Sequence, residues 1–459
     1  MLDLLIRNGE VVFPKRGVLR ADLGIKDEKI VGIYDRNQEV DAKKVIDAEG
    51  LHIFPGLIDA HEHLGIYNSV EDDFRDTKQH AVGGVTTIVN YDRIPKSYLE
   101  AFPRLKEIGE QNSYIDFGYS LGILLEDHID ELEEVIERFG VTSFKFFRNY
   151  ERQLNDKFKV NNAINLTSMD LIRILERFKS ISPKLLLGMH SENMDINRYL
   201  TQKLQQETVE DHLSTWSKTS PGYAEAESML STLYLNQIVG GNVFIVHLSS
   251  GTSVDLLEKA PWLVENGAKV ETCVHYLTLT NESAAGLHAK VGPPIQGQWD
   301  QDRLWDGIKN GLINAIGTDH VPCSKDVKYK SGTGVFETQY GFPGVGALLP
   351  LMITEGYVKR GVPLERIADI CSTQVADSFN LPQKGRIEVG ADADFAIVDL
   401  KENKTITHQL LQSASDYTVY EGMDAVGWPV YTISRGEVIL EKGKITAKPG
   451  RGKYLHRHI

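Results

Sequence analysis

The chain has 459 residues, of which 41% are hydrophobic and 25% charged, a globular composition that excludes disordered and fibrous classes. Its net charge of −14 argues against a nucleic-acid partner, because such binding relies on Lys and Arg to neutralise phosphates. Apolar runs fall far short of the ~20 residues that a membrane-spanning helix needs, and the N-terminus lacks a signal-peptide pattern. Only 3 cysteines are present. We therefore expect a cytoplasmic protein that binds neither nucleic acid nor a membrane.

The two ends of the chain share one pattern. Residues 1–53 alternate apolar and polar positions between turn signals, as half-buried antiparallel strands do. Residues 381–459 behave similarly in GRIEVGADADFAIVDL and VYTISRGEVILEKGKI. We predict that both ends form one small β-sandwich domain. The last residues, KPGRGKYLHRHI, are expected to be an exposed or subunit-contacting tail.

The middle of the chain, 54–380, alternates apolar runs with amphipathic stretches such as SMDLIRILERFKS and AEAESMLSTLYLNQI. This alternation predicts βα units around a parallel sheet. Several runs end in polar residues that a packed core disfavours: LHIFPGLIDAHEH, VTSFKFF, KLLLGMH, NVFIVHL and NAIGTDH. The pattern is typical of an α/β protein with a (β/α)8 TIM-like barrel, whose site lies at the C-terminal rim. The stretches 148–166 and 324–342 fit neither pattern, and we expect rim loops that shape a pocket.

The polar residues at the strand ends are of metal-ligating types. His61 and His63 are two positions apart, so on a strand both face the barrel mouth, together with Asp59. The other candidates end separate runs and are Lys145, His190, His247 and Asp319. Lone His-x-His pairs are common by chance, and the four further strand-end residues are what make a metal site the favoured interpretation.

Lys145 does not fit a metal site as an ammonium, because divalent cations would repel it. The field of the ions should lower its pKa and expose a neutral amine, which can add carbon dioxide. The resulting carbamate is an anionic, two-oxygen bridge between two ions. We therefore expect a carbamylated Lys145 and two divalent metal ions per subunit.

The motifs FPGLIDAHEHLG, GGVTTI, SFKFF, HSEN, VHLSSG, GPPI, TDHVPC and KGRIEVGADADFAIVD resemble the cyclic amidohydrolases, specifically the dihydropyrimidinase, hydantoinase and allantoinase group. The resemblance spans nearly the whole chain. It implies that His61, His63 and Asp319 bind one ion, that His190 and His247 bind the other, and that carboxylated Lys145 bridges them. His and carboxylate ligands suit zinc, with cobalt, manganese and iron as competitors. The resemblance also implies a homotetramer, or a homodimer, joined partly through the C-terminal segment.

The implied reaction is hydrolysis of a C–N bond in a small cyclic amide or ureide by a metal-bridging hydroxide. Asp319 would pass the proton to the leaving nitrogen. Tyr150 stands where hydantoinases and dihydropyrimidinases carry a tyrosine that donates to the substrate oxyanion. Gly292 in KVGPPI and Tyr340 in TQYGFPGVG are the candidate substrate-binding positions. Tyr340 replaces an asparagine common in hydantoinases, which leaves the ring substituent open.

Two alternatives remain at this stage. GGVTTI and TDHVPC favour an allantoinase-like hydrolase. Some relatives have lost the metal ligands and are non-catalytic assembly proteins, whereas this chain keeps all of its candidate ligands. Among other polar residues, we expect His275 to lie behind the metal ligands or in the core, and Arg93 to form a surface salt bridge rather than meet a substrate carboxylate.

Overall fold

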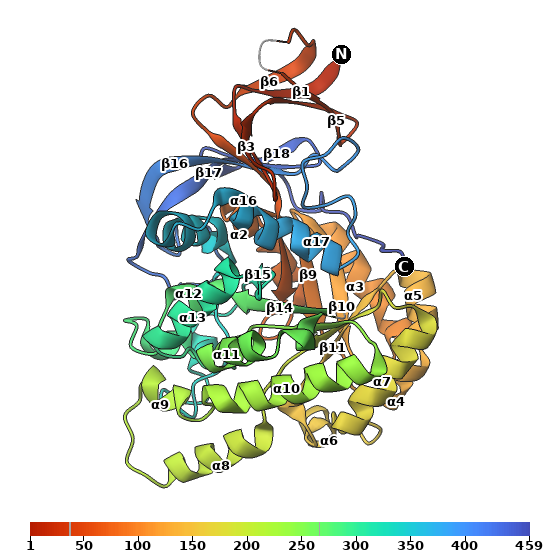
Figure 1. Ribbon diagram of the computed structural model, residues 1–459, viewed down its shortest axis with the longest axis vertical. Coiled ribbons are helices and arrows are strands. Elements are labelled where there is room, and N and C mark those ends of the chain that lie inside the picture. The colour runs from red at the N-terminus through yellow and green to blue at the C-terminus, as the bar shows by residue number, and fades with distance from the viewer. Residues whose placement is uncertain (36–37, 266) are drawn as a thin grey trace.

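The computed structural model describes residues 1–35, 38–265 and 267–459 (Figure 1). Figure 1 shows the N-terminal strands in red and the C-terminal strands in blue together at one end of the molecule, beside the helix-covered barrel. Within the described part of the chain, every helix falls short of the length and apolar character that crossing a bilayer requires.

The barrel is a sheet of 8 strands in which each strand pairs in parallel with the next along the chain. The strands are β8 (Leu57–Glu62), β9 (Val85–Asp92), β10 (Asp116–Gly122), β11 (Ser143–Phe146), β12 (Leu186–Met189), β13 (Val243–Ile245), β14 (Ala268–Cys273) and β15 (Ala315–Gly317). The last strand meets the first because Asp59 accepts hydrogen bonds from Thr318, and His63 N donates to the His320 carbonyl at 2.9 Å. The predicted (β/α)8 fold is confirmed.

Helices surround this sheet, on its outside and at the rim of the cavity. Those of the first half are α1 (Val70–Arg75), α2 (Lys78–Val82), α3 (Tyr98–Asn112), α4 (Glu126–Asp130), α5 (Leu132–Phe139), α6 (Leu154–Phe158), α7 (Ser168–Ile181), α8 (Met194–Gln205) and α9 (Leu213–Ser217). They continue with α10 (Gly222–Val239), α11 (Gly251–Lys259), α12 (Val274–Thr278), α13 (Gln298–Lys309), α14 (Lys325–Lys328), α15 (Leu348–Leu351), α16 (Leu364–Ala368) and α17 (Gln374–Ser378). The predicted helices SMDLIRILERFKS and AEAESMLSTLYLNQI are α7 and α10. Thr167 and Asp170 form a capping box that fixes the start of α7.

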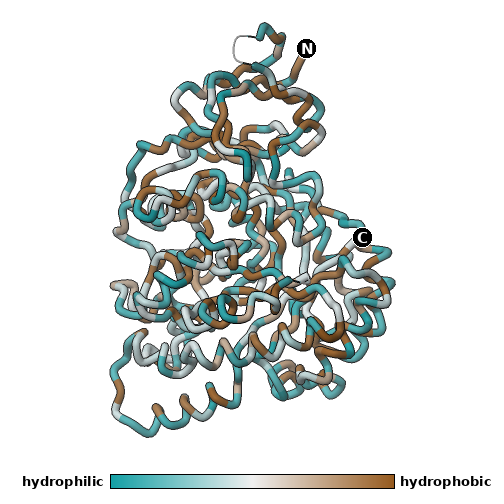
Figure 2. Tube along the Cα trace, viewed as in Figure 1, coloured by the Kyte–Doolittle hydropathy of each residue, from teal (hydrophilic) through white to brown (hydrophobic). Residues whose placement is uncertain are grey.

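The chain ends form two further sheets. One has the order β5-β4-β1-β6 and the other β19-β18-β17-β16-β7-β2-β3. Their strands are β1 (Leu2–Arg7), β2 (Glu10–Phe13), β3 (Gly17–Arg20), β4 (Asp22–Lys26), β5 (Lys29–Tyr34), β6 (Ala42–Asp47), β7 (His52–Pro55), β16 (Phe395–Thr405), β17 (Asp424–Ser434), β18 (Glu437–Glu441) and β19 (Lys444–Ile445). Apolar residues from both ends, such as Leu23, Ile53 and Ile397, share one buried cluster. Figure 2 shows hydrophobic stretches along these strands and through the barrel.

Two details of the small sheets differ from expectation. The pairs β1–β6 and β2–β7 are parallel rather than antiparallel, because longer connections bring those strands back in the same direction. The segment Arg386–Val389 lies outside any strand, so the alternation in GRIEV was a misleading signal. The domain boundaries near residues 53 and 380 stay predictions.

The C-terminal tail is exposed over much of its length, as its charges predict, but Arg457 and Tyr454 pack against the barrel. Arg457 is 3% exposed, and its guanidinium donates to Ser143 Oγ at 2.9 Å, at the start of β11. The Tyr454 ring lies 5.5 Å from that of Phe102 and 5.7 Å from that of Phe117. The tail therefore closes the barrel at the N-terminal ends of its strands, because its long side chains bury well there.

A buried ion cluster joins the barrel to the small sheets. Lys384 Nζ lies 2.5 Å from Asp116 of β10, 2.9 Å from Asp392 and 2.8 Å from Asp394. Arg435 of the β17–β18 turn also pairs with Asp116, at 2.9 Å. Burial alone would raise the pKa of Asp116, but Lys384 and Arg435 lower it to about 2. These charges stay ionised only while every member keeps its partners.

Candidate active site

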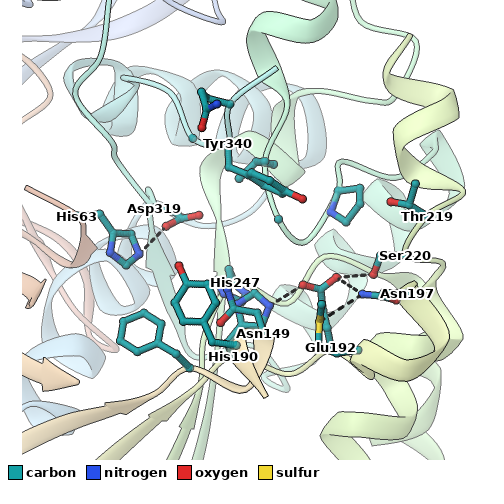
Figure 3. Close-up of a pocket in the computed structure, with 18 of the residues that line it drawn as sticks. His63, Asn149, His190, Glu192, Asn197, Thr219, Ser220, His247, Asp319 and Tyr340 are labelled. Atoms are coloured by element: carbon teal, nitrogen blue, oxygen red, sulfur yellow. Dashed lines mark hydrogen bonds and ion pairs between the residues drawn. The ribbon is translucent and has the colours of Figure 1, made fainter. Parts of the chain in front are cut away.

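A cavity of about 740 Å³ opens at the C-terminal ends of the barrel strands. Five of the predicted ligands line it: His63, Lys145, His190, His247 and Asp319. The sixth, His61, is fully buried beneath them, with its ring 5.4 Å from that of His63 and 5.2 Å from that of His247. Figure 3 shows His63, His190, His247 and Asp319 gathered around one space, so the fold brings the strand-end residues together.

One group of ligand atoms converges on Asp319. Its Oδ1 lies 3.4 Å from His61 Nε2 and 3.1 Å from His63 Nε2, and the three ligand atoms are all within 4.8 Å of one another. Burial would raise the pKa of Asp319, but the two imidazoles hold it below its usual range. An ionised carboxylate between two imidazole nitrogens is a donor set that suits a divalent cation.

A second group contains His190 and His247, whose ring centroids are 4.5 Å apart. Burial, followed by the nearby His190 and Lys145, lowers the pKa of His247 far below its usual value. Burial, followed by Lys145, does the same to the pKa of His61. These imidazoles are therefore neutral at pH 7, the form in which histidine binds metals.

His247 and Asp319 both adopt left-handed backbone, with φ of 43° and 50°. Non-glycine residues rarely occupy this region, and it costs about 1 kcal/mol or more at each position. Both residues follow the last residue of a barrel strand by two positions, where the chain turns outward. The strain is consistent with backbone that is bent to aim a side chain into the cavity.

Lys145 of β11 is 1% exposed, and its Nζ has no hydrogen-bond partner among the described residues. The amine lies 4.6 Å from the centre of the Tyr91 ring. Burial lowers the pKa of Lys145 to about 7, so a large fraction of the amine is neutral near neutral pH. A buried, unpartnered amine at this position fits a lysine that is modified or that faces cations.

Two buried glutamates of the site were missed by the sequence reasoning. Glu271 Oε2 lies 2.6 Å from His61 Nδ1 and accepts from His247 N at 3.0 Å. Glu192 Oε2 lies 2.5 Å from His190 Nε2, a contact that Figure 3 shows. Carboxylates behind imidazoles fix the ring orientation and tautomer. The available signal was an acidic residue inside the apolar strand AKVETC, and another in HSEN two positions after a ligand.

Tyr150 lies on the short 3-10 helix Arg148–Tyr150 after β11 and lines the cavity. Its ring stacks on Phe147, with centroids 5.8 Å apart, and its hydroxyl accepts a hydrogen bond from Arg93 Nη1. Arg93 also lines the cavity, which corrects the expected surface salt bridge. The position of Arg93 depends on the loop after β9, which strand periodicity does not predict.

Gly292 and Tyr340 face each other across the cavity wall. A Cβ atom on Gly292 would stand 3.3 Å from Cδ1 and Cε1 of Tyr340, so glycine allows this close approach. The Tyr340 ring packs edge-on against Trp216 at 5.3 Å, and Tyr67 donates to the Tyr340 carbonyl at 2.9 Å. Tyr340 is visible at the cavity in Figure 3.

The two stretches expected as rim loops both contribute to the cavity: Asn149, Tyr150, Gln153 and Lys157 from the first, and Gln339, Tyr340 and Gly341 from the second. His275 is fully buried and packs on Tyr276 and Phe342, as expected for a core residue. The cavity therefore has the candidate metal ligands on one side and a wall formed by two irregular loops on the other.

Comparison with known proteins places this geometry in a family. The family model described as "Amidohydrolase family" matches residues 245–439. A D-hydantoinase from Geobacillus stearothermophilus is 33% identical over 99% of this chain and 96% of its own length. The chain belongs to the amidohydrolase family. An allantoinase from Deinococcus radiodurans is also 33% identical to this amidohydrolase, over 99% of this chain and 98% of its own length.

The fold of this amidohydrolase agrees with that assignment. The crystal structure of a dihydropyrimidinase from Brevibacillus agri superposes with a TM-score of 0.89, at 31% identity, covering 99% of this chain and 98% of that one. Family membership makes the protein a metal-dependent hydrolase, and His61, His63 and Asp319 form a group that can hold an ion.

Proposed function

We propose that this amidohydrolase opens the ring of a cyclic amide or ureide, such as a hydantoin or a dihydropyrimidine, to give an N-carbamoyl amino acid. The observation that carries the proposal is the convergence of the strand-end residues and Tyr150 on one cavity. Names of the relatives, D-hydantoinase and dihydropyrimidinase, support the same reaction class. Hydrolysis adds hydroxyl to the ring carbonyl carbon and a proton to the ring nitrogen as the C–N bond breaks.

The donor set supports two divalent ions, which we propose are zinc. His61, His63 and Asp319 would hold one ion, and His190 and His247 the other. Two such ions, when bound, acidify a water molecule and polarise a carbonyl. Lys145 would bridge them as a carbamate, formed when its neutral amine bonds to the carbon of carbon dioxide and releases a proton. The buried, unpartnered Nζ and its pKa of about 7 support that role.

Asp319 is the residue suited to move the proton. Its carboxylate is ionised, since His61 and His63 hold the pKa low against the effect of burial. It lies on the cavity surface, where it can accept a proton from the attacking water and deliver it to the leaving ring nitrogen. The ring nitrogen needs that proton, because an amide anion is a poor leaving group.

Tyr150 is the proposed hydrogen-bond donor to the substrate carbonyl oxygen. Arg93 donates to its hydroxyl oxygen, which leaves the phenol hydrogen available for the substrate. Losing one donor to a developing oxyanion typically costs about 100- to 1000-fold in turnover. We expect Tyr150→Phe to lower kcat at least about tenfold while both metals stay bound. A variant with near-normal kcat and full metal content would contradict this role.

The direct test is a hydrolysis panel of hydantoin, dihydrouracil, allantoin, dihydroorotate and simple cyclic imides, with metal content measured on the same preparation. Ring opening of a hydantoin or dihydrouracil by the zinc-loaded enzyme is expected. Activity on none of these compounds would contradict the proposal. Metal content well below one ion per chain, after expression with zinc, would favour a non-catalytic assembly protein.

An allantoinase-like activity is the second candidate. The similarity to an allantoinase is as high as that to a D-hydantoinase. Amide side chains of Asn149, Gln153 and Gln339 line the cavity and could pair with a ureido substituent. Faster hydrolysis of allantoin than of hydantoin would favour this candidate.

We propose that the chain assembles as a homotetramer, with a homodimer as the alternative. Helix α10 presents Tyr223, Leu230, Tyr234 and Ile238 at the surface, and Trp262 lies beside Tyr234 with ring centroids 6.3 Å apart. An exposed apolar stripe of this kind is typical of an interface. Light scattering on the purified protein measures the mass directly, and a monomer would contradict the proposal. The cytoplasmic location stays a prediction.

A further inference from the structure

Two cationic side chains flank Tyr150 inside the cavity. Arg93, which follows β9, places its guanidinium carbon 5.8 Å from the centre of the Tyr150 ring, and Lys157 of α6 places Nζ 4.4 Å from it. Both residues line the cavity. They come from segments 64 positions apart in the sequence, so the fold brings two positive charges to the same wall of the site.

Neither cation has a carboxylate partner within 4.0 Å in the part of the chain that the structure describes, whereas neighbouring arginines do. Arg148 and Arg152 pair with Glu151, each at 3.7 Å, and Arg198 pairs with Asp195 at 2.7 Å. Most arginines of the described chain have such a partner, whereas many exposed lysines do not, so the missing partner is informative above all for Arg93. Two cations that remain unpaired on a cavity wall indicate that the wall faces an anion.

The carboxylates on the cavity surface already have hydrogen-bond or ion-pair partners other than Arg93 and Lys157. Among the described lining residues the acidic ones are Glu192 and Asp319. Glu192 accepts from Ser220 and Asn197 and contacts His190, as Figure 3 shows, while Asp319 contacts His63. The protein therefore supplies no anion for the cationic wall, and a ligand is left to supply it.

We propose that the ring substituent of the substrate carries a carboxylate, bound by Arg93 and Lys157. This inference rests on the proposed function and specifies the substrate class of the same site. A guanidinium has several N–H donors in a planar fork, and Arg93 donates one of them to the Tyr150 hydroxyl. The remaining donors can bind a carboxylate.

The arrangement couples recognition to chemistry, because Arg93 contacts both the proposed oxyanion donor and the space for the substituent. A carboxylate on this wall would hold the ring beside the Tyr150 hydroxyl. A neutral substituent would fill the same space but leave the partly buried Arg93 without an anionic partner, and that penalty discriminates against it. The site is thus selective for acidic substituents through its unpaired charges.

The test compares two nearly isosteric substrates, 5-(2-carboxyethyl)hydantoin and 5-(2-carbamoylethyl)hydantoin, on the zinc-loaded enzyme. A charge-assisted pair should give the acid a kcat/KM at least about tenfold higher than the amide, and added salt should reduce this ratio. A ratio of one or below would overturn the inference while leaving the proposed function intact.

Variants locate the effect. Arg93→Met and Lys157→Met should each reduce the acid-to-amide ratio about fivefold or more. Lys159→Met is the matched control, because Lys159 is an exposed lysine two positions away that does not line the cavity. It should leave the ratio unchanged. Ratios that stay at the wild-type value in both test variants would overturn the assignment to this wall.

Binding of the ring-opened compounds separates recognition from catalysis. Calorimetry with N-carbamoylglutamate and N-carbamoylglutamine needs no turnover, and the acid should bind at least about tenfold tighter to the zinc-loaded protein. Tighter binding of the acid without hydrolysis of these hydantoins or of any compound in the panel would uphold the carboxylate site and overturn the proposed function. Equal binding would overturn the inference.

Discussion

Replacing Glu271 by Gln should weaken metal binding through His61. The Glu271 carboxylate lies 2.6 Å from His61 Nδ1, and it accepts from the backbone N–H of His247 at 3.0 Å. Accepting from Nδ1 fixes the tautomer in which His61 Nε2 is free to point toward Asp319, 3.4 Å away. Gln keeps the shape and one acceptor oxygen but removes the charge.

The loss can be estimated from the hydrogen bond. A bond to a charged group contributes about 1.5–3 kcal/mol and a neutral one about 1 kcal/mol, so the substitution removes about 0.5–2 kcal/mol of the free energy that holds the His61 ring in place. That corresponds to a metal affinity about 2- to 30-fold weaker. The upper part of this range overlaps the loss generally seen when a residue behind a metal ligand is changed.

In the metal-free protein, the same Glu271→Gln substitution should favour stability at higher pH instead of weakening a function. Burial raises the pKa of Glu271 to about 8, from an ordinary value of 4.5. Between these values the folded state keeps a proton that the unfolded chain releases, so the free energy of unfolding falls as pH rises. The full shift sets an upper bound of about 5 kcal/mol. Metal-free Glu271→Gln should therefore lose less stability than wild type between about pH 5 and pH 8.

Two measurements check this pair of effects: competition of the enzyme with a chromophoric chelator for zinc, and urea unfolding of the metal-free protein across pH. Glu62→Gln is the matched control, because Glu62 is another buried carboxylate of β8 that contacts a histidine outside the predicted ligand set, His80, at 2.6 Å. It should leave zinc affinity unchanged. Zinc affinity of Glu271→Gln within twofold of wild type would refute the reasoning.

Three further predictions follow from the same structure. Lys384→Met leaves Asp116 and Asp394 buried without their shared cation, so it should lower the free energy of unfolding in urea by about 3–5 kcal/mol. Lys29→Met is the control: it removes a half-exposed partner of Asp392 and should lower the free energy of unfolding by under about 1 kcal/mol. Because burial lowers the pKa of Lys145 to about 7, recovery of activity by metal-free enzyme given zinc at a constant concentration of dissolved carbon dioxide should accelerate as pH rises through 7; a rate independent of pH would contradict carboxylation of a neutral amine. Removing metal with a chelator should abolish ring opening and lower Tm by several degrees, seen by scanning calorimetry, and re-adding zinc should restore both.

Strand periodicity predicted that the candidate ligands would converge on one cavity, because their positions depend on short-range rules. His61 and His63 are two apart on β8, and Lys145 lies on β11, whose apolar neighbours fix its register. In a parallel barrel all such strand ends meet at one rim, so local patterns were enough to bring them together. The family motifs then supplied the division of ligands between two ions, which periodicity alone does not contain.

The residues that sequence reasoning missed are those set by tertiary contacts. Glu271 acts on His61 across more than 200 positions, a pairing that exists only once β14 and β8 share a barrel. Arg93 enters the cavity because the loop after β9 turns inward, and Arg457 is buried because the tail folds under the barrel. A charged residue in an irregular segment has no periodicity to show which way it points.

The rim of the barrel is built to hold cations, and its residues are poorly satisfied without them. Lys145 has an amine with no hydrogen-bond partner among the described residues, Glu271 is driven toward protonation by burial, and His247 and Asp319 sit in left-handed backbone. The opposite end is satisfied by protein groups alone, through the Lys384 cluster and the tail. We therefore expect metal removal to loosen the rim more than the opposite end of the barrel. Hydrogen exchange of the metal-free protein should then be faster around His247 and Asp319 than around Asp116 and Ser143.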